Sequence, residues 1–170
     1  MAGYGLPNEQ HLSVVLQKSL EFDGHNIEII NGSVSGSTSA GGLNIAEWTL
    51  SENNIDLMIL CLGANDMLRG INPKETKNNL EEIIEIAKNK NIKVIIAGMI
   101  APTSYGYAYK KSFDKIFSDL SKKHKLQLIP FLLEGVAQKP EFNLSDGMHP
   151  NDRGTIIIGN TLKKAILKNL

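Results

Sequence analysis

The stretch that decides the fold is residues 55–66, Ile-Asp-Leu-Met-Ile-Leu-Cys-Leu-Gly-Ala-Asn-Asp. Its first eight residues are almost all apolar, which is typical of a parallel-sheet strand that helices cover on both faces. The polar residues Gly63 to Asp66 follow this strand directly. Because ligands bind at the carboxyl ends of the strands in open α/β folds, we expect the Asn65 side chain at a ligand-binding edge.

Strand and helix patterns alternate on both sides of this stretch. Further strands are predicted at residues 27–30, 92–99 and 126–129, and helices at about residues 7–22, 38–50, 109–120 and 152–168, with another helix after Asn72-Pro73. This alternation predicts an α/β fold, a flavodoxin-like three-layer αβα sandwich with a mostly parallel sheet. The chain opens on a helix pattern, whereas such folds usually begin with the strand that becomes central in the sheet.

Length and composition narrow the class of protein. At 170 residues, without repeats or a linker, the chain is expected to form one domain over residues 1–170. Lys+Arg and Asp+Glu are both 18, so the formal net charge is zero and nucleic acid is not an expected partner. No polybasic or membrane-length apolar run indicates a stable membrane anchor. The compartment stays open: an upstream signal peptide would place the protein in the periplasm or outside the cell, and otherwise it would be cytoplasmic.

The loop Asp146-Gly147-Met148-His149-Pro150-Asn151 carries the clearest chemical signal. A carboxylate three positions before a histidine, in a polar loop, is typical of the orienter and base of a nucleophilic triad. Acyl transfer also needs oxyanion donors, which a backbone N–H of residues 32–37 and the Asn65 amide can supply. The sequence therefore predicts an ester or thioester hydrolase.

Plainer interpretations exist for each part. Gly36 fits a turn glycine, residues 63–66 fit an ordinary strand-end turn, and Asp146 with His149 fits a surface pair or part of a metal site. The other histidines, His11, His25 and His124, show no ligand spacing, so no metal is expected. No phosphate-binding glycine loop or dinucleotide fingerprint is present, so no cofactor is expected. Cys61, inside an apolar run, is expected to be a buried core residue.

Taken together, these loops resemble the SGNH (GDSL-type) hydrolase family, in its bacterial arylesterase, lysophospholipase and acyl-CoA thioesterase branch. The family's second block matches residues 31–38, its third block matches residues 63–66 and 68–70, and its fifth block matches residues 146–151. The resemblance implies a serine-type hydrolase that works through an acyl-enzyme. It implies that Asp146 orients the general base His149, and that Gly36 (backbone N–H) and Asn65 (side chain) form the oxyanion hole. Ala101, Tyr105 and Met148 are expected to contact a small-molecule ester or thioester substrate.

The family's first block, Gly-Asp-Ser-Leu-(Thr/Ser)-Ala-Gly-Tyr-Gly, matches this chain only from Ala2 onward. Its nucleophilic serine would lie upstream of Met1, together with the central strand of the sheet. The nearby Ser33, Ser35 and Ser37 lie in the loop assigned to the oxyanion donor. We therefore expect the 170-residue chain to be an N-terminally truncated, inactive or crippled form.

Two further interpretations follow from that departure. If the central strand is missing, its two neighbours have unpaired backbone groups, and this suggests a homo-oligomer or a strand-swapped assembly that pairs them. The alternative function is a non-catalytic acyl- or ester-binding pseudoenzyme. A flavodoxin-like regulator would share only the layer architecture and would leave the Asp146–His149 spacing without an explanation.

Overall fold

The computed structural model describes residues 2–51 and 54–170, so that Met1, which stands where the family has Thr or Ser, lies outside the described residues. The chain divides into two compact units. Unit 1 consists of Met1–Ser35 and Leu132–Leu170, and unit 2 consists of Gly36–Phe131.

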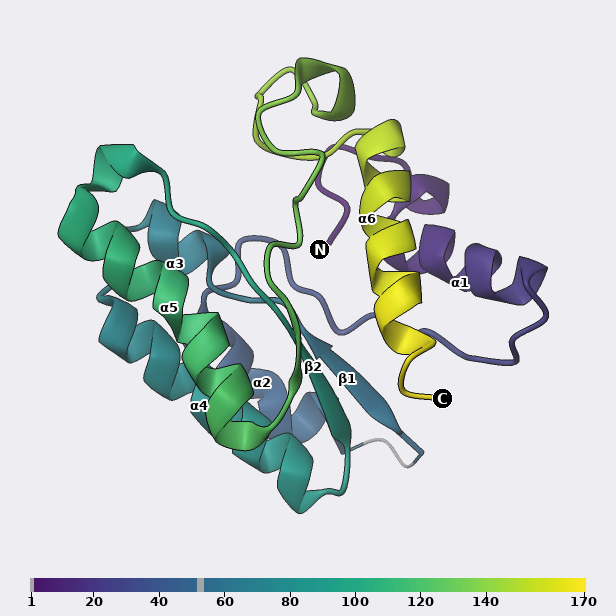
Figure 1. Ribbon diagram of the computed structural model, residues 1–170. Helices are drawn as coiled ribbons and strands as arrows, with labels where there is room; N and C mark the ends of the chain where they lie inside the picture. Colours follow the sequence, from purple (N-terminus) through teal and green to yellow (C-terminus); the bar gives the residue numbers. More distant parts are fainter. Residues whose placement is uncertain (1, 52–53) are drawn as a thin grey trace. The chain divides into compact units, whose positions relative to one another are not determined.

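Unit 2 contains a parallel sheet of three strands in the order β1-β2-β3 (Figure 1). The strands are β1 (Leu57–Leu60), β2 (Lys93–Ala97) and β3 (Gln127–Ile129). Ile95 pairs with Ile59 on one side and with Gln127 on the other, so β2 is the central strand. Four successive residues of β2, from Val94 to Ala97, are buried, as the apolar pattern predicted. The predicted α/β class with a parallel sheet is confirmed.

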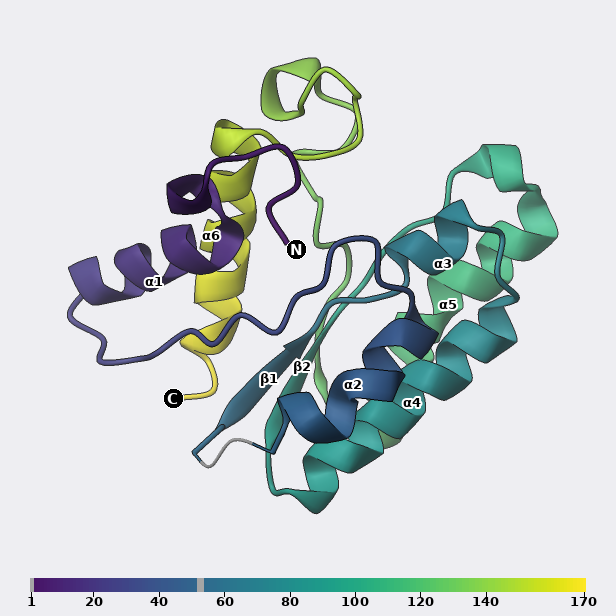
Figure 2. The same ribbon diagram turned by 180° about the vertical axis from the view of Figure 1, so that it is seen from behind.

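Unit 2 contains the three predicted helices, α2 (Ser39–Thr49), α4 (Pro73–Asn89) and α5 (Tyr107–His124), and also a short helix, α3 (Ala64–Leu68), and a 3-10 turn, η2 (Thr103–Tyr105), that the sequence did not predict. The Asn72 side chain caps α4 by accepting from the Lys74 N–H, with Pro73 at the first helical position. Helix α4 packs against both α2 and α5, as Figure 2 shows from behind, and it also contacts β2.

Unit 1 is built on the packing of α1 (Leu12–Phe22) against α6 (Asp152–Ile166) (Figure 1). It also contains the 3-10 turns η1 (Asn8–Gln10) and η3 (Pro140–Phe142). Both long helices bury an apolar face that includes Leu16, Leu20 and Ile158. At the edge of this interface the Lys163 ammonium donates to the Ser19 carbonyl at 3.0 Å and pairs with Asp23 at 2.5 Å.

The strand predicted at residues 27–30 is not formed. Within the described part of the chain, no strand pairs with these residues. Their backbone is bonded instead to one side chain of α1: Gln17 donates to the Ile27 carbonyl at 2.7 Å and accepts from the Ile29 N–H at 2.7 Å. A strand exists only where a neighbouring strand supplies the ladder, and an apolar sequence pattern cannot report whether that neighbour is present.

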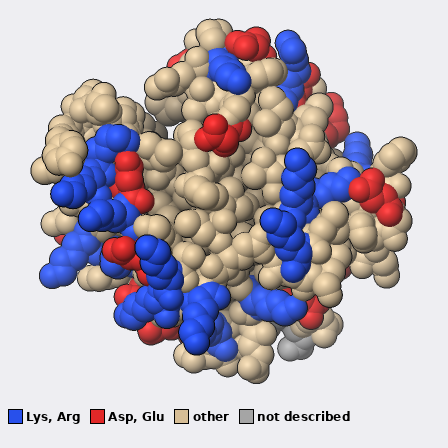
Figure 3. Space-filling model, in the orientation of Figure 1, with Lys and Arg blue, Asp and Glu red and all other residues tan. Residues whose placement is uncertain are grey.

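Charge is mixed over the face shown in Figure 3, with basic side chains gathered over α5. Helix α5 carries five lysines against two aspartates. Among the described residues, no helix combines the length and the apolar character that crossing a bilayer requires.

Candidate functional site

Asp146 and His149 form a hydrogen-bonded pair in unit 1. The Asp146 Oδ2 lies 2.7 Å from the His149 Nδ1. The other carboxylate oxygen, Oδ1, accepts from the backbone N–H groups of Met148 at 2.8 Å and His149 at 2.9 Å. The spacing of three residues therefore lets one carboxylate hold both the turn and the imidazole. About 42 % of the His149 side chain is exposed, so the ring is open to solvent on its other side.

These hydrogen bonds also set the protonation of the pair. The backbone N–H groups of His149 and Met148, followed by the His149 side chain, lower the pKa of Asp146 from 3.8 to about 2. The carboxylate is therefore ionised at neutral pH and can only accept a hydrogen bond. Because it faces the His149 Nδ1, that nitrogen carries the proton in the neutral ring, and the Nε2 lone pair is left available as a base.

The loop that carries the pair is tied down by backbone contacts. Asn143, which is buried, donates from its side chain to the carbonyls of Val136 at 2.8 Å and Lys139 at 2.7 Å. The Leu144 N–H donates to the His149 carbonyl at 2.7 Å, which closes the loop across its base. Asn151 then caps α6 by accepting from the Gly154 N–H at 3.0 Å. His149 thus lies between a hydrogen-bonded loop and the N-terminus of α6.

Tyr4 packs on the imidazole of His149, a contact that the sequence analysis did not predict; there Tyr4 was only part of the match that begins at Ala2. The two ring centroids lie 4.4 Å apart with an interplanar angle of 34°. The tyrosine sits in a turn closed by the Leu6 N–H on the Gly3 carbonyl. Gly3 has a φ of +74° and lies so close to the His11 ring that a Cβ would come within 2.1 Å of it. The turn needs glycine at this position, and it places Tyr4 against the His149 ring.

Gly36 and Asn65 lie in unit 2, in two loops that are bonded to each other. The Asn65 amide donates to the Ser37 carbonyl at 3.0 Å, and the Arg69 guanidinium donates to the Gly36 carbonyl at 2.9 Å. The first bond uses one of the two N–H groups of the amide. Within the described part of the chain, no acceptor is bonded to the Gly36 N–H. Two unused N–H donors, from Gly36 and Asn65, therefore belong to loops that are linked to one another.

Asp66, next to Asn65, is fully buried and links these loops to the neighbouring helices by hydrogen bonds. Its carboxyl accepts from the Ser39 N–H at 2.8 Å, from the Ser39 hydroxyl and from the Thr76 hydroxyl at 3.2 Å. The Ser39 hydroxyl in turn accepts from the Asn79 amide at 3.0 Å. One carboxyl thus joins the start of α2, the short helix α3 and the first turns of α4. The sequence pattern pointed to Asn65 but gave Asp66 no role.

The residues predicted to contact substrate differ in exposure. Met148, next to His149 in unit 1, is about 50 % exposed. In unit 2, Tyr105 of η2 stacks on Tyr109 with ring centroids 5.5 Å apart. Ala101 is buried, and its backbone bonds Asp114 and Lys110. The loop after β2 borders a hollow of about 360 Å³, lined by Thr103, Tyr107, Lys110, Lys111 and Asp114. Substrate contact by Ala101, Tyr105 and Met148 stays a prediction.

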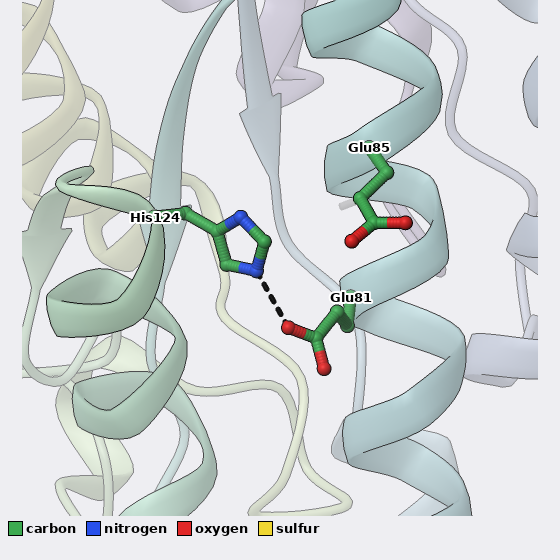
Figure 4. Close-up of side chains that lie close together, drawn as sticks. All are labelled: Glu81, Glu85 and His124. Carbon is green, nitrogen blue, oxygen red and sulfur yellow. Dashed lines mark hydrogen bonds and ion pairs between the residues drawn. The ribbon is translucent and has the colours of Figure 1, made fainter.

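A second cluster of titratable side chains, Glu81, Glu85 and His124, lies between α4 and α5 in unit 2 (Figure 4). Lys123 and His124 bond the Glu81 carboxylate, both at 2.6 Å, and hold the pKa of Glu81 below its ordinary value. The sequence expectation of no metal rested on spacing along the chain, which cannot report that two helices meet. Cys61 was expected to be a buried core residue, but its exposure is intermediate; desolvation raises the pKa of its thiol and so favours the protonated, less reactive form.

Comparison with known proteins agrees with the interpretation that this geometry favours. Residues 1–155 match the family described as GDSL-like Lipase/Acylhydrolase. The chain is 35 % identical to an arylesterase of Vibrio mimicus over 169 residues, which is 99 % of this chain and 84 % of that protein. It is 36 % identical to esterase TesA of Pseudomonas aeruginosa over 149 residues, which is 88 % of this chain and 74 % of that protein.

Solved structures agree. The crystal structure of TesA superposes with a TM-score of 0.93 at 32 % identity, covering 99 % of this chain and 94 % of that one. The psychrotrophic esterase EstA from Pseudoalteromonas, solved with monoethylphosphonate as inhibitor, superposes with a TM-score of 0.93 at 29 % identity, covering 98 % and 91 %. From the family match, these relatives and the superposition on solved esterase structures, the chain belongs to the GDSL-like lipase/acylhydrolase family of SGNH hydrolases.

Proposed function

We propose that this protein hydrolyses carboxylic esters or thioesters through an acyl-enzyme, with His149 as general base and Asp146 as its orienter. The observation that carries the proposal is the 2.7 Å contact between the Asp146 Oδ2 and the His149 Nδ1. Because Asp146 is ionised at neutral pH, it fixes the tautomer in which Nε2 accepts a proton, which is the state a general base needs.

In the proposed reaction, a serine Oγ bonds to the substrate carbonyl carbon while its proton passes to the His149 Nε2. The carbonyl oxygen becomes an oxyanion, which the Gly36 N–H and the Asn65 amide stabilise by donating hydrogen bonds. As the intermediate collapses, the bond to the leaving group breaks, and the alcohol or thiol takes the proton from Nε2. A water molecule then attacks the acyl-serine by the same route, which releases the acid and restores the serine.

The attacking serine is not assigned to any of the 170 residues. Ser33, Ser35 and Ser37 belong to the loop of the proposed oxyanion donor, and the family's first-block serine has no counterpart among the residues given. We propose that residues 1–170 form a single hydrolase domain when that block precedes them, and that on their own they are inactive or crippled. The family match, which spans residues of both units, supports the single domain.

We infer the substrate class from the names of the relatives. They include an arylesterase, an esterase and a protein named thioesterase 1/protease 1/lysophospholipase L1 in Escherichia coli, to which this chain is 32 % identical over 138 residues. We propose a small-molecule ester or thioester as substrate. The half-exposed Met148 beside the base offers an apolar contact for such a molecule.

The test is hydrolysis of a p-nitrophenyl ester and of an acyl-CoA by two proteins. One is the 170-residue chain, and the other carries an added segment that ends Gly-Asp-Ser-Leu-Thr directly before Ala2. The extended protein should hydrolyse at least one substrate, and His149→Ala should reduce its rate by about a thousandfold or more. The matched control His25→Ala should leave the rate unchanged. Equal rates for His149→Ala and the parent would contradict the proposal, and a folded but inert extended protein would favour an acyl-binding role.

A further inference from the structure

Three side chains with metal-binding chemistry converge between two helices of unit 2, as Figure 4 shows. Glu81 and Glu85 are one turn apart on α4, so they share a face of that helix. His124 is the last residue of α5, which packs against α4. Each side chain offers one ligand atom, and these atoms all lie within 4.8 Å of one another.

The histidine is prepositioned rather than loose on the surface. Its side chain is only 7 % exposed, and its Nε2 lies 2.6 Å from a Glu81 carboxylate oxygen. Beside it lies an open hollow of about 280 Å³, lined by Glu85, Lys88, Asn89 and His124. Glu85 itself is exposed, so its carboxylate can move toward the imidazole without unpacking the core. The hollow gives room for an ion together with coordinating water.

We propose that Glu81, Glu85 and His124 bind one divalent transition-metal ion of the zinc type, with water completing the coordination. An imidazole nitrogen with two carboxylate oxygens suits such ions, whereas calcium and magnesium take oxygen ligands. Zinc holds these ligands at about 2.0–2.2 Å, so ligand atoms around it stand roughly 3–3.5 Å apart. Small rotations of the two glutamate side chains would reach this spacing. They would bring together the ligand atoms that now lie up to 4.8 Å apart, and they would lengthen the 2.6 Å contact between the His124 Nε2 and the Glu81 carboxylate.

The competing partner is Lys123, whose ammonium lies 2.6 Å from Glu81. An ion must displace this ammonium, but the Lys123 side chain is 61 % exposed and reaches water easily once released. An exposed ion pair of this kind changes an equilibrium by at most about fivefold. Three ligand bonds to one ion outweigh that, because removing even an outer partner of a metal ligand typically costs tenfold or more in affinity.

The ion would link the C-terminal end of α5 to the middle of α4, and so would stabilise the folded form of unit 2. An ion that binds only the folded state raises the folding equilibrium constant by a factor of one plus the ratio of free ion to Kd. At a hundredfold excess over Kd, folding is favoured about a hundredfold more than without the ion.

The experiment is titration of the protein with Co²⁺, followed by its visible ligand-field absorption, and with Zn²⁺ by calorimetry. One ion per chain should bind, and His124→Gln and Glu85→Gln should each weaken binding at least about tenfold. Lys123→Gln removes the competitor and should strengthen binding by about 1.5- to fivefold. The matched controls His25→Gln and Glu82→Gln, which leave the three ligands intact, should bind like the parent.

Three results would overturn the proposal: no saturable binding, unchanged affinity in His124→Gln and Glu85→Gln, or equal weakening in the His25→Gln control. Circular dichroism of each variant without ion checks that it is folded. If a ligand variant does not fold, Lys123→Gln still decides, because binding that weakens or stays the same there contradicts a site that includes Glu81. None of these readouts depends on hydrolysis, so failure here leaves the proposed function unaffected.

Discussion

Replacing Asp66 by alanine tests whether one buried carboxyl holds together the two loops that carry Gly36 and Asn65. The substitution removes the acceptor of three hydrogen bonds: those from the Ser39 N–H, the Ser39 hydroxyl and the Thr76 hydroxyl. A buried donor left unpaired costs about 1–3 kcal/mol. Water can enter the space left by the carboxyl, so we take the lower end for each donor and expect a loss of about 3–4 kcal/mol.

That loss is a large part of the roughly 5–15 kcal/mol by which domains are stable. The assay is urea unfolding followed by far-UV circular dichroism, with the free energy obtained by linear extrapolation. The matched control is Asp119→Ala, which removes an exposed partner of Lys77 and should cost less than about 1 kcal/mol. If Asp66→Ala costs no more than this control, the carboxyl does not fasten the loops and the reasoning is wrong.

Three further predictions concern other parts of the chain. Hydrogen bonds lower the pKa of Asp146 from 3.8 to about 2, so its charge stabilises the fold above about pH 4 and loses this effect as pH falls toward 2. The difference in unfolding free energy between the parent and Asp146→Asn, measured in urea, should therefore vanish over that range. Gly98→Ala places a Cβ 2.3 Å from the Pro130 carbonyl oxygen and should lower the free energy of unfolding by about 2 kcal/mol or more. In the control Gly24→Ala the added Cβ meets no atom within 4 Å, so only the φ of +82° opposes it and the loss should be about 1 kcal/mol. Tyr4→Leu should move the imidazole proton resonances of His149 in NMR spectra because the stacked ring is lost, and Tyr4→Phe should not; equal shifts would contradict the stacking.

The sequence predicted the parts of the fold that local patterns determine. The apolar runs around Leu57, Ile95 and Ile129 form the three parallel strands. Asn72 and Pro73 begin a helix where the cap pattern placed one. These features depend on residues a few positions apart, and the side chains that specify them lie within the same element.

Features that depend on distant neighbours were missed or wrong. Residues 27–30 have the composition of a strand, but no described residue pairs with them as a strand, and Gln17 bonds their backbone instead. Sequence spacing gave no sign that His124 meets Glu81, since the two residues come from different helices.

The candidate site divides in the same way. The loop Asp146–His149 could be read from the sequence because one Asx-type turn places both partners within three residues of each other. The stacking of Tyr4 on His149 and the role of Asp66 could not, because each depends on a contact between segments far apart along the chain.

We propose that residues 1–170 supply the base and the oxyanion donors but not the nucleophile. The sharpest test is the intact mass of the protein after exposure to a fluorophosphonate, a reagent that tags activated serines. We expect no adduct on the 170-residue chain, and one adduct on the chain extended by Gly-Asp-Ser-Leu-Thr that disappears with His149→Ala. A single adduct on the 170-residue chain itself, lost with His149→Ala, would show that the nucleophile lies among these residues, and peptide mapping would identify the serine.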